Sequence, residues 1–129
     1  MAIAVLLADD SEILRKAIRK LLETAPDFEV VGEVPNFRQT LRATRELKPQ
    51  IVVMDIYMPD ESAVAPSEVS SQLESLGCCL IAISYSNEED TKKLAATYGA
   101  RKLLDKMRLA SDLLPALEEC AAEILSRRH

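Results

Sequence analysis

The sequence of 129 residues contains no tryptophan, and aromatic residues make up only 4% of it. Proteins that hold single-stranded nucleic acids stack the bases on aromatic side chains, so this composition argues against that function. The chain also lacks an excess of basic residues, because 21 acidic residues outnumber 16 Lys and Arg and give a net charge of −5. Phosphate contacts need a basic surface, and we therefore predict no direct nucleic-acid partner.

Glycine, cysteine and long apolar runs are also scarce. The three glycines form no phosphate-binding loop after the first predicted strand, which argues against a nucleotide or flavin site. No apolar run reaches membrane-spanning length, and no basic region precedes the first strand as in a signal peptide. Cys78, Cys79 and Cys120, an odd number with two adjacent, fit a reduced compartment and are predicted to be small apolar core residues. We expect a cytoplasmic protein without a membrane partner.

The apolar stretch at residues 51–54 runs directly into Asp55 and is followed by Ile-Tyr-Met-Pro. A run of this length is typical of a strand buried on both faces, and Pro59 prevents its continuation. Asp55 is therefore expected at the carboxyl end of a central parallel strand, where open α/β sheets bind their ligands. Taken alone, Asp55 is more simply a carboxylate that ends the strand and caps a turn.

Strand-like and helix-like segments alternate along the whole chain. Strands are predicted at residues 3–8, 28–34, 51–55, 80–83 and 102–105. Helices are expected after capping residues Ser11 or Asp10, Asn36, Asn87 and Ser111, and from Pro66, a proline suited to a first helical position. Such alternation specifies an α/β fold in one domain, 1–129, with a five-stranded parallel sheet and helices on both faces.

Polar residues follow four of the five strands. Parallel strands end at one edge of the sheet, and there the sequence places Asp9-Asp10, Asp55, Ser84 and Asp105-Lys106. The neighbouring carboxylates of Asp9, Asp10 and Asp55 would repel one another unless a cation is present. A hard divalent ion such as Mg²⁺ takes oxygen ligands of this kind. Individually, Lys106 is most simply a surface lysine and Ser84 a turn hydroxyl; their common location at strand ends favours a site.

These residues resemble the receiver domain of two-component response regulators (the CheY-like family). The resemblance is carried by Ala8-Asp9-Asp10-Ser11, by Asp55-Ile56-Tyr57-Met58-Pro59, by Ile83-Ser84 and by Gly99-Ala100 through Lys106, and it covers nearly the whole chain. It implies a flavodoxin-like sheet with strand order 2-1-3-4-5. The receivers most similar to this chain usually precede a helix-turn-helix output domain, which we do not expect within these residues.

The resemblance also implies a role for each residue. Asp55 would accept a phosphoryl group from a histidine kinase or phosphotransfer protein, while Ser84 and Lys106 would contact the phosphoryl oxygens. Asp10, Asp55 and the backbone carbonyl of Tyr57 would bind Mg²⁺, with Asp9 acting through water. The domain would be a signalling switch rather than an enzyme. An unidentified downstream protein, or a second copy in a homodimer, would recognise the face formed by the fourth helix, the fifth strand and the fifth helix.

The chain departs from the family pattern at four places. Tyr85 replaces a small residue and is expected to shield the phosphoryl group, to hinder the kinase or simply to point into solvent. Leu103 replaces the usual switch aromatic, and Met107 replaces a proline after Lys106, so we predict a trans Lys106–Met107 peptide. The loop at residues 60–63 lacks the usual glycine, and this loop and the helix after it are expected to be disordered or reshaped.

Two other functions compete with the phospho-accepting receiver. The first is a degenerate receiver that binds partners without phosphorylation, which the substitutions at Tyr85, Leu103 and Met107 favour. The second is a phosphatase of the haloacid-dehalogenase type, which also uses an aspartate after an apolar strand. That chemistry needs a second acid two residues later, where this chain has Tyr57.

Overall fold

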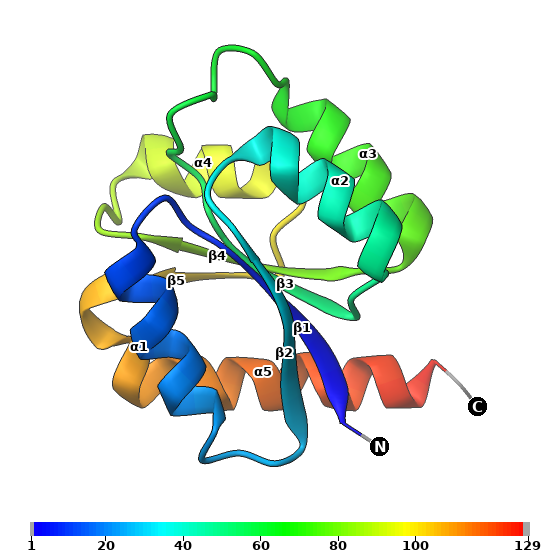
Figure 1. Ribbon diagram of the computed structural model, residues 1–129. Helices are drawn as coiled ribbons and strands as arrows, with labels where there is room; N and C mark the ends of the chain where they lie inside the picture. The colour runs from blue at the N-terminus through cyan, green and yellow to red at the C-terminus, as the bar shows by residue number, and fades with distance from the viewer. Residues whose placement is uncertain (1, 128–129) are drawn as a thin grey trace.

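The computed structural model describes residues 2–127 and shows one five-stranded parallel sheet with helices on both faces (Figure 1). The strand order is β2-β1-β3-β4-β5, as the resemblance implied. The elements are β1 (Ile3–Ala8), α1 (Glu12–Leu22), β2 (Phe28–Val34), α2 (Phe37–Leu47), β3 (Ile51–Asp55), α3 (Pro66–Leu76), β4 (Cys79–Ser84), α4 (Glu89–Thr97), β5 (Lys102–Asp105), the 3₁₀ turn η1 (Lys106–Arg108) and α5 (Leu109–Ser126). Among the described residues, no helix has the length and apolar character needed to cross a membrane.

The strand β3 lies at the centre of the sheet and is buried along its whole length. It pairs with β1 on one side and with β4 on the other. Continuous apolar sequence in all three strands reflects burial on both faces. The register places Ala8 beside Met54 and Asp55 beside Ile83, so the residues that follow these strands meet at one edge of the sheet.

Two apolar cores cover the opposite faces of the sheet. Successive residues of β1 point to alternate faces, so Val5 and Leu7 pack with residues of α1 and α5. Leu6 and Ala8 instead pack with residues of α2, α3 and α4. Figure 1 shows the same division of the helices between the two faces. On the second face the ring of Tyr98 stacks on that of Phe37, with ring centroids 5.4 Å apart.

Two predicted helix caps, Ser11 and Asn36, are confirmed. The Ser11 side chain accepts a hydrogen bond from the Leu14 N–H at 3.1 Å, and Asn36 accepts one from the Gln39 N–H at 2.8 Å. These bonds satisfy N–H groups that the first helical turn leaves without partners. Gly77 ends α3 in the left-handed conformation, with φ of 71°, which glycine adopts without steric cost.

Two predicted caps are wrong. The capping residue of α4 is Glu88 rather than Asn87, and its side chain makes no capping hydrogen bond. Ser111 lies inside α5, where its hydroxyl donates to the Arg108 carbonyl. The reason is that η1 leads directly into α5, whose own capping position is Arg108 and has no side-chain cap; the capping carboxylate is that of Asp105 at the start of η1, which accepts from the Met107 N–H at 2.8 Å.

The segment between β3 and α3 forms a series of turns, and α3 is a regular helix of 11 residues. Of the two alternatives expected here, a disordered or a reshaped segment, disorder is wrong, because the loop has defined turns and the helix is regular. The carboxylate of Asp60 accepts hydrogen bonds from the backbone N–H groups of Phe37, at 2.9 Å, and Arg38, at 3.0 Å. Asp60 thereby satisfies the first turn of α2 from a distant segment. No cis peptide bond occurs within residues 2–127, and the predicted trans Lys106–Met107 peptide is confirmed.

Replacing Asp60 by alanine is expected to lower the free energy of unfolding by about 1 kcal/mol, the usual cost of a lost helix cap. The same change should loosen the loop, because its carboxylate contacts to α2 are lost. Urea unfolding gives the first quantity, and amide hydrogen exchange at residues 60–65 gives the second. Glu61→Ala is the matched control, since Glu61 is exposed. Equal effects of the two substitutions would contradict this role of Asp60.

Candidate functional site

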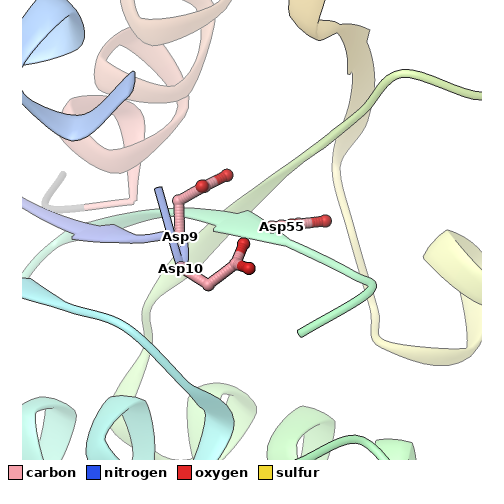
Figure 2. Close-up of side chains that lie close together, drawn as sticks. All are labelled: Asp9, Asp10 and Asp55. Carbon is pink, nitrogen blue, oxygen red and sulfur yellow. The ribbon is translucent and has the colours of Figure 1, made fainter. Parts of the chain in front are cut away.

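Three carboxylates meet at the carboxyl edge of the sheet (Figure 2). Asp9 and Asp10 follow β1, and Asp55 is the last residue of β3. One oxygen from each of the three side chains lies within 4.8 Å of the others. Asp9 and Asp55 are buried, whereas Asp10 is exposed. The sequence predicted this convergence, and the parallel register of β1 and β3 produces it.

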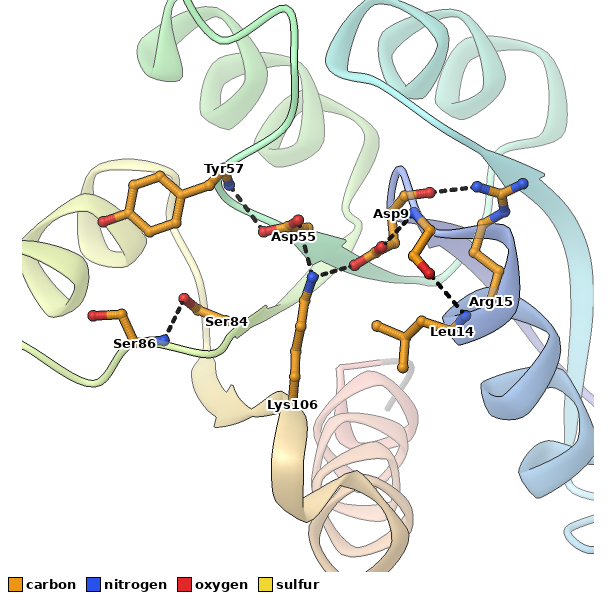
Figure 3. A network of polar contacts seen from close by, with 9 residues as sticks. Asp9, Leu14, Arg15, Asp55, Tyr57, Ser84, Ser86 and Lys106 are labelled. Carbon is orange, nitrogen blue, oxygen red and sulfur yellow. Dashed lines mark hydrogen bonds and ion pairs between the residues drawn. The ribbon is translucent and has the colours of Figure 1, made fainter.

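The ammonium group of Lys106 reaches into this cluster (Figure 3). Its Nζ lies 3.0 Å from Asp55 Oδ2, to which it donates a hydrogen bond, and 2.6 Å from Asp9 Oδ2. Because Ser84 pairs with Asp105 in the sheet, Lys106 follows β5 immediately beyond that edge. The Lys106 side chain is only 6% exposed, so its charge acts with little screening by water.

Burial and charge act in opposite directions on these groups. The pKa of Asp55 is raised from its ordinary value, mainly because burial disfavours the carboxylate, and the negative charge of Asp9 adds to this. The Tyr57 N–H, which donates to Asp55 Oδ1 at 2.9 Å, and Lys106 oppose the shift without cancelling it. Burial disfavours the charge of Lys106 too, but its contacts with Asp9 and Asp55 outweigh this and raise the pKa of the ammonium.

The cluster has the features of a cation site. Asp9 Oδ2 is buried and, although it lies beside Lys106, no group within residues 2–127 donates a well-directed hydrogen bond to it. Three carboxylates face a single ammonium group, which leaves an excess of negative charge when all are ionised. Carboxylate oxygens at this spacing are suitable ligands for a hard divalent ion. The aspartates therefore could hold a metal ion.

Asp9 is fixed by two further contacts. Its Oδ1 accepts a hydrogen bond from the Ser11 N–H at 2.8 Å, and its backbone carbonyl accepts one from the Arg15 guanidinium. Arg15 in turn forms an ion pair with Glu33 on β2. The turn that follows β1 therefore orients the Asp9 carboxylate. Arg15 on α1 and Glu33 on β2 fix the position of the Asp9 backbone.

Ser84 is buried at the end of β4, and its hydroxyl accepts a hydrogen bond from the Ser86 N–H at 3.0 Å. Side-chain hydrogen bonds through Thr91 of α4 connect this loop after β4 to the loop after β3. The Thr91 hydroxyl donates to Ser86 Oγ at 2.8 Å and lies 2.9 Å from the Tyr57 hydroxyl. Since the single proton of Thr91 points to Ser86, Tyr57 is the donor to Thr91. This chain of contacts could not be predicted from the sequence, because no local pattern pairs a loop tyrosine with a helical threonine.

Tyr85 lies beside the lysine of the cluster. Its ring is 66% exposed, and the ring centroid is 5.0 Å from Lys106 Nζ, within cation–π range. The phenol therefore does not simply point away from the site. Leu103 is partly buried and packs with the core on the α2, α3 and α4 face. Tyr85 and Met107 are both exposed beside the lysine.

The raised pKa of Asp55 predicts a pH-dependent stability. The folded state binds this proton more tightly than the unfolded chain, so the free energy of unfolding should fall as pH rises from the ordinary Asp value of 3.8 through the raised pKa. Asp55→Asn cannot ionise, and above that range it should be more stable than the wild type by about 1 kcal/mol, while Lys106 keeps Asp9 as its partner.

Urea unfolding of both proteins between pH 4 and pH 8, in buffer with a metal chelator, measures this difference. The difference should grow with pH. Asp90→Asn, at an exposed position on α4, is the control and should follow the wild type. A stability difference that stays constant across the pH range would show that the Asp55 carboxylate is not penalised by burial.

Comparison with known families identifies the chain. Residues 5–118 match the family described as response regulator receiver domain. This chain belongs to that family. The receiver domain thus carries an acidic pocket of Asp9, Asp10 and Asp55 beside Lys106. Membership also places it among signalling phospho-acceptor domains rather than among enzymes.

Curated relatives agree with this assignment. The chain is 33% identical over 118 residues to the nitrate/nitrite response regulator protein NarL of Escherichia coli K12, covering 92% of this chain and 54% of NarL. It is 32% identical over 120 residues to the response regulator protein VraR of Staphylococcus epidermidis, covering 92% of this chain and 56% of VraR. The receiver domain thus spans about half the length of these two relatives.

Solved structures share the fold. The receiver domain of the stress response regulator RcsB from Escherichia coli, in its non-phosphorylated form, superposes with a TM-score of 0.82 at 20% identity, covering 95% of each chain. The response regulator domain of Thermotoga maritima CheB gives a TM-score of 0.79 at 24% identity, covering 93% of this chain and 96% of that one. The predicted α/β fold with strand order 2-1-3-4-5 is confirmed.

Proposed function

We propose that this receiver domain accepts a phosphoryl group on Asp55 from a histidine kinase or phosphotransfer protein and thereby changes its affinity for a partner. The observation that supports this most strongly is the position of the Asp55 carboxylate, buried at a strand end and bonded to Lys106 beside two further aspartates. A carboxylate oxygen of Asp55 would form a bond to phosphorus as the bond from phosphorus to the donor's histidine nitrogen breaks. The nitrogen keeps the electron pair of that bond.

Mg²⁺ is the cofactor that we propose for this step. Asp10, Asp55 and the backbone carbonyl of Tyr57 would hold it, with Asp9 acting through a water molecule. When bound, Mg²⁺ supplies positive charge that offsets the charge on the phosphoryl oxygens. The buried Asp9 Oδ2 that lacks a directed hydrogen bond, and the spacing of the three carboxylates, support this assignment.

Lys106 and Ser84 would complete the site for the phosphoryl oxygens. Phosphoryl transfer needs mainly positioning and neutralisation of charge on these oxygens. The Lys106 ammonium would move its hydrogen bond from the Asp55 carboxylate to an oxygen of the bound phosphoryl group. The Ser84 hydroxyl accepts from Ser86 and keeps its own proton available to donate.

The change at Asp55 would be passed on through the loop after β4. If Ser84 turns toward the phosphoryl group, the bond from Ser86 and the contacts of Thr91 and Tyr57 must rearrange with it. Thr91 lies in α4, so the position of that helix would depend on phosphorylation. A downstream protein, or a second copy of the domain, would then recognise the face formed by α4, β5 and α5.

A degenerate receiver that binds partners without phosphorylation is the second candidate. The position of the Tyr85 ring near Lys106 favours it, because a bulky side chain there narrows the approach to the acidic pocket. Leu103, in place of the usual switch aromatic, favours it as well. Against it stands the full set of three carboxylates and a lysine in contact.

Incubation with a small phosphodonor such as acetyl phosphate separates the two candidates. With Mg²⁺ present, the intact protein should gain the mass of one phosphoryl group per chain, and a metal chelator should prevent the gain. Tyr85→Ala serves as a second protein, in which the phosphodonor has wider access to the acidic pocket. Absence of the gain in both proteins would rule out the phospho-accepting function and leave the degenerate receiver.

A further inference from the structure

Two cysteines meet in the core at the end of the sheet opposite the acidic pocket. Cys79 is the first residue of β4, whereas Ser84 ends the same strand at the acidic edge. Cys120 lies in α5 and belongs to the same apolar core as Cys79, on the sheet face covered by α1 and α5. Their Sγ atoms are 2.6 Å apart and share a hydrogen bond, although both thiols are free. Ordinary core packing does not require two sulfur atoms to approach so closely.

Of the two residues, only Cys79 retains exposed surface, at 6%. Cys79 lines a pocket of ≈ 320 Å³ together with Cys78, Arg101, Glu123 and Arg127. Cys120 has no exposed surface and lies behind it. A small reagent that enters the pocket would therefore reach Cys79 before Cys120, with Cys78 as the competing thiol in the same pocket.

The surroundings of Cys79 favour its thiolate. The pKa of this thiol is lowered, chiefly because Cys120 can donate a hydrogen bond to it, with smaller contributions from the Arg101 and Arg127 guanidinium groups. Burial and the Glu123 carboxylate oppose the shift. A thiolate is the reactive form of cysteine. Cys78 differs, because burial raises its pKa to about 11 and its sulfur donates to the Pro49 carbonyl.

We propose that Cys79 and Cys120 are a redox-active dithiol that a hydroperoxide converts into an intramolecular disulfide. In the first step the Cys79 thiolate attacks the nearer peroxide oxygen, the O–O bond breaks, and the departing oxygen leaves as water or alcohol after protonation. Cys79 is then a sulfenic acid. In the second step the Cys120 sulfur attacks the Cys79 sulfur, forming the S–S bond, and the hydroxyl group leaves as water with the Cys120 proton.

The two thiols together lose two protons and two electrons, and the peroxide gains them. A disulfide bond is about 2.05 Å long, so the two sulfur atoms need to approach only slightly from their present 2.6 Å separation. The bond would tie α5 to the start of β4. It requires neither Mg²⁺ nor a phosphorylated Asp55, so it stands independently of the function proposed above.

Treatment of the intact native protein with hydrogen peroxide tests this proposal. The expected product has lost two hydrogen atoms per chain, carries one disulfide within the chain, and returns to the starting mass with dithiothreitol. Because Cys78 and Cys79 are adjacent and share proteolytic peptides, Cys78→Ser is the deciding variant. It should form the same disulfide, whereas Cys79→Ala should lose it completely.

The Cys120→Ala variant gives an independent measurement. Without its partner, oxidised Cys79 should remain a sulfenic acid and react with a dimedone-type probe at that residue. The proposal would be overturned if peroxide produced a Cys78–Cys120 bond, a disulfide between chains, or only sulfinic and sulfonic acids. It would also be overturned if native wild-type protein kept all three thiols after this treatment.

Discussion

Asp55→Asn is expected to abolish phosphorylation of the chain by acetyl phosphate, with a loss of at least about 100-fold in rate, equivalent to roughly 3 kcal/mol in activation free energy. The amide oxygen is a much weaker nucleophile than a carboxylate. Among the described residues, Asp55 is the carboxylate that both ends a strand and accepts a directed hydrogen bond from Lys106. Mass spectrometry of the intact protein over time gives the rate.

The control for this result is Asp90→Asn, which removes an exposed carboxylate outside the pocket and should react like the wild type. Because Asp55→Asn is expected to be at least as stable as the wild type at neutral pH, misfolding would not explain its loss of reaction. An unchanged phosphoryl gain in Asp55→Asn would mean that another residue is the acceptor.

Asp10→Asn is expected to raise the Mg²⁺ concentration needed for half-maximal phosphorylation by about tenfold or more, which corresponds to roughly 1.4 kcal/mol of binding free energy. Asp10 is exposed and contributes one of the three gathered carboxylates. Its loss should therefore weaken the metal site with little effect on folding. A titration of the phosphorylation rate with MgCl₂ measures the change.

Thermal unfolding without and with MgCl₂ distinguishes a loss of metal binding from a loss of folding stability. The wild-type melting temperature should rise with added Mg²⁺ in a saturable manner, because a ligand that binds only the folded state stabilises it. Asp10→Asn should melt like the wild type in chelator and respond less to Mg²⁺. Identical Mg²⁺ responses of the two proteins would show that Asp10 does not bind the ion.

The strands could be predicted closely because each one is a short apolar run that ends in a polar residue. The end of β3 at Asp55 was predicted correctly, and β4 begins one residue earlier than expected, at Cys79. Helix starts were less predictable. Ser11 and Asn36 act as caps because a strand-to-helix turn precedes them, whereas the 3₁₀ turn before α5 moves the helix start ahead of Ser111.

The acidic pocket could be predicted because it depends on topology alone. In a parallel sheet, Asp9, Asp55 and Lys106 must emerge at one edge once their strands are recognised. Contacts between segments that the topology does not align could not be predicted. The Asp60 carboxylate at the start of α2 and the Tyr57–Thr91 hydrogen bond depend on how particular loops fold back.

The cysteines show the same limit. Their number and adjacency predicted reduced, apolar core residues, and the structure does bury Cys79 and Cys120. Their mutual contact depends on the rotation of α5 against β4, which residue spacing does not fix. The position of Tyr85 beside Lys106 is similar, since the turn after Ser84 decides where that ring lies.

Phosphoryl transfer to Asp55 itself is the step on which the proposed function depends. Borohydride reduction of the phosphorylated protein tests it most directly, because this reagent converts an aspartyl phosphate into homoserine, which peptide sequencing then locates. After reaction with acetyl phosphate and Mg²⁺, we predict homoserine at position 55 and no conversion at positions 9 or 10. Homoserine at another aspartate, or none in protein that has gained a phosphoryl group, would contradict the account.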